Sequence, residues 1–203
     1  MITSTRFVLE TGDLSEPHRV LVTRMESTAR RMNRLVADLL EFTRTRFGDT
    51  IPILAAEMDV ARMLDDVAAE VRASYPASTI TVRATGELHG QWDCERLTQA
   101  IINLVSNAVH HGTQGGPIDI DATGSHAEVV IAVCNQGPPI AADEIGDIFE
   151  GVKALTASRE HDRRHLGLGL YIVNKIVQAH HGSIAVESSA EAGTKFTMHL
   201  PRV

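Results

Sequence analysis

The sequence contains only two cysteines, and none of its apolar runs approaches the length needed to span a membrane. Cys94 and Cys134 lie far apart and match no metal-binding or redox spacing, so we expect both to be reduced and buried in a cytosolic protein. The first residues, from Met1 to Arg6, lack the apolar core of a signal peptide. These absences predict a soluble, cytoplasmic chain without membrane contact of its own, although a longer parent protein could be membrane-anchored.

An excess of positive charge is also missing. The chain has 19 lysines and arginines against 26 acidic residues, which gives a net charge of −7. A general nucleic-acid binder needs a basic surface to meet phosphates, so this class is excluded. The basic residues between Arg24 and Arg46 alternate with acids and apolar residues, which is typical of solvated helix faces. With 203 residues, 43% of them hydrophobic, the chain can form one large or two small soluble domains.

Apolar residues between positions 21 and 42 recur at alternating spacings of four and three, with Thr28 as a polar exception. This pattern predicts a long helix of a coiled coil or four-helix bundle, capped by Ser15 or Asp13 and ending at Phe47–Gly48. A shorter helical piece is expected at residues 2–10. Because these two elements cannot bury both sides of the seam, we expect a homodimer through this helix; a core shared with the following domain is the alternative. The seam residues are Leu21, Met25, Met32, Leu35, Leu39 and Phe42.

Beyond Ile51–Pro52 the pattern changes to alternating helices and strands. Helical periodicity covers residues 60–75, 93–111 and 167–181, and strand patterns cover 79–84, 117–122, 128–133, 182–187 and 194–200. The strands are expected to be mostly antiparallel. The sequence therefore predicts an α+β protein with a two-layer α/β sandwich, preceded by the long helix.

The helix predicted at residues 93–111 carries polar residues on the side opposite its apolar stripe. Gln99, Asn103, Asn107 and His110 recur at i, i+4, i+8 and i+11. Asparagine is a poor helix former, yet its carbonyl oxygen is a suitable ligand for Mg²⁺. Taken alone, the pattern fits a solvent-facing stripe equally well.

Three further stretches have the character of ligand-binding turns. In residues 134–140, Asn135 can hydrogen-bond a base edge and Gly137 allows close backbone approach, although a plain Gly-Pro turn is the simpler reading. In residues 166–173, two glycines open a helix whose first amides suit a phosphate. The third glycine of a dinucleotide fingerprint is missing there, which disfavours a Rossmann site. The turn at 193–196 enters the last strand and says little by itself.

Taken together and in this order, the four stretches resemble the N, G1, G2 and G3 boxes of sensor histidine kinases, whose nucleotide-binding fold is shared with gyrase and MutL. Residues 148–150 match the intervening F box, and residues 30–48 resemble the second helix of the dimerisation hairpin. The resemblance implies a Bergerat-type ATP-binding catalytic domain at residues 51–203. It also implies that residues 1–50 form a partial dimerisation hairpin, with a remnant of helix one and all of helix two.

The resemblance also implies roles for individual residues. Asn107 would ligate Mg²⁺, while Asn103 and His110 would approach the phosphates of ATP and complete the catalytic set. Asn135 would read adenine. Residues 151–165 would form a lid whose Lys153, Arg163 and Arg164 either contact phosphate or are solvated charges. The other implied nucleotide contacts are His111, Gly137, Ile140, Lys153, His165, Leu166, Gly167, Leu168, Gly169, Leu170 and Thr194.

The chain also departs from the family pattern. Asn135 stands where most relatives have aspartate, His110 replaces a lysine or arginine, and His165 occupies the place of a first glycine. No phosphoacceptor motif such as H-E-L-R-x-P occurs in the sequence. A zinc site formed by His161 and His165 lacks further ligands and is disfavoured.

The expected function is that of an ATP-dependent protein histidine kinase. Asn103 replaces the glutamate that activates water in hydrolytic relatives, and an amide cannot act as a general base. The γ-phosphoryl group would pass to a histidine supplied in trans or by a missing N-terminal segment, and then to a response regulator. Autophosphorylation of this chain alone is not expected. The alternatives are a non-catalytic ATP-binding or phosphotransfer adaptor dimer and an anti-sigma-factor-like serine kinase.

Overall fold

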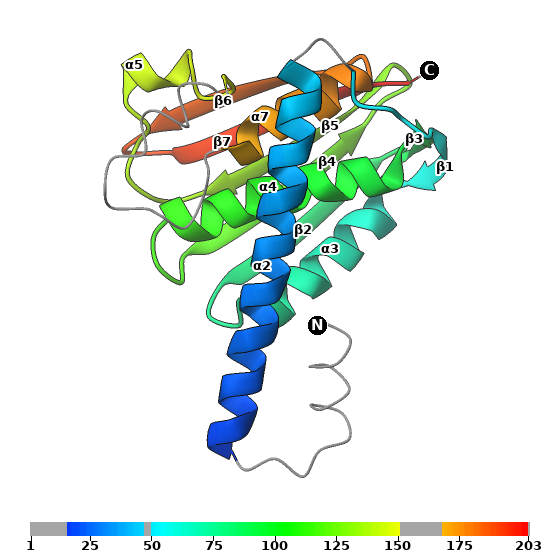
Figure 1. Cartoon of the computed structure of the whole chain (residues 1–203). Helices are drawn as coiled ribbons and strands as arrows, with labels where there is room; N and C mark the ends of the chain where they lie inside the picture. Colours follow the sequence, from blue (N-terminus) through cyan, green and yellow to red (C-terminus); the bar gives the residue numbers. More distant parts are fainter. Residues whose placement is uncertain (1–15, 47–49, 151–167, 203) are drawn as a thin grey trace.

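The computed structural model describes residues 16–46, 50–150 and 168–202. In these residues a five-stranded mixed sheet is covered on one face by helices α3 (Val60–Ser74), α4 (Cys94–His111) and α7 (Leu168–Ala179) (Figure 1). The strand order is β2-β4-β5-β7-β6, with β2 and β4 parallel and the other neighbouring pairs antiparallel. The predicted two-layer α/β sandwich is confirmed. Its strands are β2 (Thr79–Gly86), β4 (Pro117–Gly124), β5 (Glu128–Asn135), β6 (Ser183–Ser189) and β7 (Gly193–Pro201).

Three short elements were not anticipated from the sequence. Strands β1 (Ala56–Asp59) and β3 (His89–Trp92) pair as a separate antiparallel ribbon, and helix α5 spans Ala142–Ile145. Each contains four residues. That is too short for apolar periodicity to show, and neither strand is rich in β-branched residues.

The two helices that follow the ribbon begin at aspartates. Asp59 caps α3 by accepting a hydrogen bond from the Ala61 N–H at 2.9 Å. Asp93 caps α4 by accepting from the Arg96 N–H at 3.1 Å, and it also accepts from the Leu54 N–H at 2.8 Å. Burial alone would raise the pKa of Asp93, but these two backbone N–H groups hold it below its ordinary value. The carboxylate therefore ties the segment before β1 to the start of α4.

A buried histidine after α7 also binds at the start of α4. His180 follows α7 and is 4% exposed. Its Nε2 accepts a hydrogen bond from the Asp93 N–H at 3.0 Å, and its Nδ1 lies 2.8 Å from the Ile176 carbonyl oxygen, to which it donates. Because burial penalises the charged imidazolium, the pKa of His180 lies below its ordinary value of 6.5. The neutral ring thus links the end of α7 to the start of α4 through these two hydrogen bonds.

We expect this histidine to make the protein less stable in mild acid. The unfolded chain binds a proton at His180 near pH 6.5, whereas the folded chain does so only at lower pH. The free energy of unfolding should therefore fall as pH decreases below 6.5, until the lowered pKa is reached. Urea unfolding of wild type and His180→Gln at about pH 7.5 and about pH 5.5 measures this contribution. Equal pH dependence in both proteins would contradict it.

The cysteine prediction was partly wrong. Both cysteines are free, but Cys94 is exposed and Cys134 is only half-buried. Cys94 is the first residue of α4 and lies outside the stripe that packs on the sheet, which begins at Leu97. Cys134 lies in β5 between the buried positions Val133 and Asn135, so its side chain is on the sheet face away from the helices. Its partial burial raises the pKa of its thiol.

The long helix α2 spans Glu16–Arg46, and residues 47–49, where the predicted end falls, lie outside the described residues. The expected helical piece at residues 2–10 also lies outside them. Near the C-terminus of α2, Phe42 and Thr45 are buried against the sandwich. Within the described ranges, no helix is long and apolar enough to cross a membrane. Large apolar side chains stay exposed along the rest of α2 in the single chain: Leu21, Met25, Met32, Val36, Leu39 and Leu40.

Candidate nucleotide-binding site

The polar face of α4 meets the start of α7. Asn103 is half-buried, and its Nδ2 donates a hydrogen bond to the Gly169 carbonyl oxygen at 3.4 Å. A Cβ added to Gly169 would lie 3.7 Å from Cγ of Asn103, an ordinary van der Waals contact, which shows that the two residues are close neighbours. Leu168, beside it, is buried in the core, and Leu170 is half-buried. The first and third predicted stretches are therefore adjacent in space.

One turn further along α4, the polar face is less engaged. Asn107 is half-buried, and within the described part of the chain its side chain makes no hydrogen bond, so its carbonyl oxygen is available to a ligand. His110 is exposed, and its ring lies edge-on to Tyr75 with 5.9 Å between the ring centroids. His111 is exposed in the last turn of α4.

The turn after β5 packs closely on the C-terminal end of α4. The Gln136 carbonyl oxygen accepts a hydrogen bond from the Thr113 N–H at 2.7 Å. A Cβ added to Gly137 would lie 2.9 Å from Cα of Gly112, a separation that real Cβ atoms essentially never show. The predicted close backbone approach at Gly137 is thus towards the end of α4. Asn135, immediately before the turn, is 8% exposed.

A polar network joins the second and fourth stretches. Asn135 of β5 is paired in register with Thr194 of β7. The buried Thr194 hydroxyl lies 2.8 Å from the Ser188 hydroxyl in β6, and Ser188 Oγ accepts from the Ile140 N–H at 3.0 Å. Ser188 was missed, because a serine in a strand gives no sequence signal of this pairing. The network fixes the loop after β5 against the edge of the sheet.

The F-box segment lies beside this network. The Phe149 ring is edge-on to Phe196, two residues after Thr194 in β7, with ring centroids 6.3 Å apart. The remaining predicted site residues lie outside the described residues. They are Lys153, His165, Leu166 and Gly167, together with the lid residues Arg163 and Arg164 and His161 of the disfavoured zinc pair.

The donor set fits a nucleotide-bound cation better than a dedicated metal centre. In the described residues, no group of three or more histidine, cysteine, aspartate or glutamate side chains could hold a metal ion. Mg²⁺ needs few protein ligands, because phosphate oxygens and water fill most of its coordination sphere. The neutral carbonyl oxygen of Asn107 fits that requirement.

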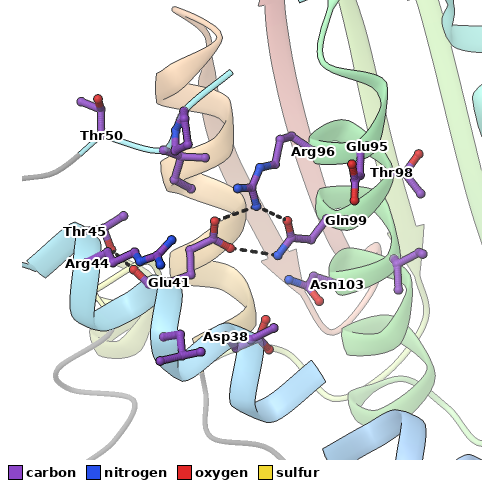
Figure 2. A pocket seen from close by; sticks show the side chains of 15 residues that line it. Asp38, Glu41, Arg44, Thr45, Thr50, Glu95, Arg96, Thr98, Gln99 and Asn103 are labelled. Atoms are coloured by element: carbon purple, nitrogen blue, oxygen red, sulfur yellow. Dashed lines mark hydrogen bonds and ion pairs between the residues drawn. The ribbon is translucent and has the colours of Figure 1, made fainter. Parts of the chain in front are cut away.

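The N-terminal end of the α4 polar face serves a different purpose, as Figure 2 shows. Glu41 of α2 forms a salt bridge with Arg96 at 2.7 Å and accepts a hydrogen bond from Gln99 Nε2 at 3.0 Å. Arg96 also donates to Gln99 Oε1 at 3.0 Å. Gln99, the first residue of the predicted polar stripe, therefore binds the long helix. Asn103, one turn later, lines the same groove between α2 and α4.

Helix α2 also contacts α7, just after its glycine. The Thr45 and Tyr171 hydroxyls are 3.0 Å apart, and the Phe42 ring lies edge-on to Tyr171 with 5.2 Å between centroids. Tyr171 is two residues from Gly169, whose carbonyl oxygen binds Asn103. The long helix thus touches both elements that carry the proposed phosphate-binding residues.

Known proteins resemble this chain in sequence and in fold. The family model described as "Histidine kinase-, DNA gyrase B-, and HSP90-like ATPase" matches residues 92–203. The signal transduction histidine-protein kinase AfsQ2 of Streptomyces coelicolor is 33% identical over 176 residues, which are 87% of this chain and 32% of that protein. The chain spans less than half of the length of the curated relatives that it matches.

Solved structures of histidine kinases have a similar fold. Full-length ShkA in complex with AMPPNP is 25% identical with a TM-score of 0.71, and the match covers 98% of this chain and 42% of ShkA. ThkA in complex with the response regulator TrrA is 22% identical with a TM-score of 0.66, covering 100% of this chain and 59% of ThkA, and it supports the fold alone. Because the family model covers more than half of the chain, the chain belongs to the histidine kinase-, DNA gyrase B- and HSP90-like ATPase family, among the catalytic domains of sensor histidine kinases.

Proposed function

We propose that residues 51–203 are a catalytic domain that binds Mg²⁺–ATP and transfers its γ-phosphoryl group to a histidine, and that residues 1–50 belong to a dimerisation hairpin. The observation that carries the proposal is the meeting of the predicted stretches around α4. Asn103 hydrogen-bonds the start of α7, and the side-chain carbonyl of Asn107 makes no hydrogen bond in the described part of the chain. The turn after Asn135 packs on the C-terminal end of α4. This arrangement offers a phosphate end and a base end on one side of the sandwich.

The chemistry proposed for this site is positioning rather than activation of water. Asn107 would hold the cation through its amide oxygen, and a bound Mg²⁺ would neutralise charge on the phosphates. Asn103 lies one turn earlier, where an amide can orient a phosphate but cannot remove a proton from water. The γ-phosphoryl group is thereby kept for an external nucleophile.

The acceptor histidine would be supplied in trans or by an N-terminal segment of a longer protein. A response-regulator aspartate would receive the phosphoryl group next. A second copy of the chain would cover the apolar side chains that α2 leaves exposed, among them Met25, Met32 and Val36.

The test combines nucleotide binding with covalent labelling. We expect calorimetry to show ATP binding that depends on Mg²⁺ and disappears with a chelator, and γ-labelled ATP to leave no label on this chain. Absence of ATP binding would contradict the proposal. An acid-labile, base-stable label on the chain would show that one of its own histidines is the acceptor, and would contradict supply from another segment.

A further inference from the structure

The polar contacts of α2 lie on both sides of the place where α4 and α7 are hydrogen-bonded to each other. In α4, Gln99 lies one helical turn before Asn103, and its side chain binds Glu41 of α2. In α7, Tyr171 belongs to the first turn, and its hydroxyl lies 3.0 Å from the Thr45 hydroxyl of α2. Helix α2 is therefore joined to both helices that carry the proposed phosphate-binding residues, close to those residues.

The contact with α4 is a closed ring formed by three side chains, Glu41, Arg96 and Gln99 (Figure 2). Arg96 Nη1 donates to Glu41 Oε1 at 2.7 Å and to Gln99 Oε1 at 3.0 Å. Gln99 Nε2 donates to the other carboxylate oxygen, Glu41 Oε2, at 3.0 Å. The side chain of Glu41 is only 13% exposed, so the ring is largely withdrawn from water. Because both oxygens of Glu41 accept, an amide in its place, with a single acceptor, could not close this ring.

The contact with α7 has a definite direction. The Thr45 hydroxyl has one proton, which it donates within α2 to the carbonyl oxygens of Glu41 at 2.9 Å and Phe42 at 3.2 Å. The hydrogen bond between the two hydroxyls is therefore donated by Tyr171 and accepted by Thr45. The backbone of Glu41 thus holds the hydroxyl that binds α7, while its side chain holds α4.

Resting on the proposed function, we propose that Glu41 is a positioning residue for the phosphate end of the nucleotide site. It holds α4 through its carboxylate and α7 through the Thr45–Tyr171 contact, and so fixes the spacing between the two helices. Asn103 lines the groove between α2 and α4, so a shift of α4 relative to α2 displaces Asn103 as well. A site whose groups are already correctly spaced binds its ligand without the cost of ordering them.

The base end of the site should not depend on Glu41. The turn after Asn135 packs on the C-terminal end of α4, near Gly112, whereas the ring with Glu41 lies near the N-terminal end of this helix. Loss of the ring should therefore weaken the binding of ATP but not the binding of adenosine, which has no phosphates. A general loss of structure would weaken both.

The test uses the full chain and begins with Glu41→Gln, which keeps the size of the side chain and removes one acceptor. We expect this variant to bind Mg²⁺–ATP about fivefold more weakly than wild type in calorimetry. Adenosine, titrated by NMR, should bind both proteins equally. Thr43→Ala is the matched control on α2, because Thr43 is exposed and its hydroxyl bonds only the Leu40 carbonyl of the same helix. It should bind ATP as wild type does.

A double variant tests whether the ring itself is responsible. In Glu41→Gln/Gln99→Glu the new amide can donate to the new carboxylate, and Arg96 can still donate to an oxygen on each side chain. The ring closes again with one hydrogen bond reversed and with the net charge unchanged. We expect this variant to recover ATP affinity to within about twofold of wild type.

Tyr171→Phe provides an independent measurement on the other helix. It keeps the ring that packs on Phe42 and removes only the hydroxyl that donates to Thr45. We expect ATP binding about threefold weaker than wild type, again with unchanged adenosine binding. This measurement also stands if thermal melting shows that Glu41→Gln is not folded.

Three results would overturn the proposal: unchanged ATP affinity in both Glu41→Gln and Tyr171→Phe, an equal loss of ATP and adenosine affinity, or a folded double variant that does not recover. Failure of wild type to bind ATP would instead overturn the proposed function itself. The two failures are thereby distinguished.

Discussion

The Asn107→Ala variant is expected to bind Mg²⁺–ATP about 100-fold more weakly than wild type, which corresponds to about 2.7 kcal/mol. The reason is that, among the asparagines and glutamines of α4, only Asn107 has a side chain that makes no hydrogen bond to a described residue. The side chain of Asn103, in contrast, is bound to the Gly169 carbonyl oxygen. Alanine is a strong helix former, so the substitution removes the ligand without weakening α4. Calorimetric titration with Mg²⁺ and with a chelator measures the loss and its dependence on the cation.

A neighbouring residue on the same helix provides the control. Ser106 is half-buried in α4 and belongs to none of the predicted nucleotide contacts, so Ser106→Ala should bind Mg²⁺–ATP as wild type does. Asn107→Asp retains an oxygen ligand and should retain more affinity than Asn107→Ala when Mg²⁺ is present. If Asn107→Ala bound ATP with unchanged affinity and unchanged dependence on Mg²⁺, the metal role of this residue would be refuted.

The Gly193→Ala variant is expected to lose more than about 3 kcal/mol of unfolding free energy. Gly193 has φ of +75°, a conformation that costs an L-residue about 1–2 kcal/mol. In addition, a Cβ at this position would lie 2.2 Å from the Asn135 carbonyl oxygen and 3.0 Å from Cα of Gln136. Both contacts are with backbone, which cannot move aside without opening the β5–β7 pairing. Urea unfolding measures the change.

Gly146 offers a matched control. It follows helix α5 with φ of −64° and ψ of −28°, and a Cβ there would meet nothing within 4 Å. Gly146→Ala should therefore be neutral or stabilise the protein by about 0.4–1 kcal/mol, because alanine restricts the unfolded chain. If Gly193→Ala and Gly146→Ala changed the unfolding free energy equally, the steric argument at Gly193 would fail.

The helices of the sandwich were predictable because their buried stripes repeat over several turns. Leu97, Ile101, Leu104 and Ala108 mark α4 clearly, and all are buried as expected. What could not be predicted depends on contacts between distant segments. Nothing local in β2 and β4 shows that they run parallel, and the four-residue strands of the ribbon are too short to show a pattern.

The candidate site was predictable to the extent that it depends on residue types at fixed spacing along the chain. Asn103 and Gly169 were identified separately, and the structure brings them into contact. The role of Gln99 was not visible, because its partner Glu41 lies 58 residues away on another helix. Ser188 was missed because a serine in a strand belongs to no motif, although its hydroxyl links Thr194 to the Ile140 N–H of a segment 48 residues away.

Trp92 gives the protein a built-in optical probe. It is the only tryptophan in the sequence, it is 1% exposed, and its indole N–H donates to the Pro201 carbonyl oxygen at 3.1 Å. Its fluorescence therefore reports a single environment, in which the end of β3 meets the end of β7. Because exposure to water shifts indole emission to longer wavelength, the colour of that light follows whether the C-terminal strand remains attached to the ribbon, without any added dye.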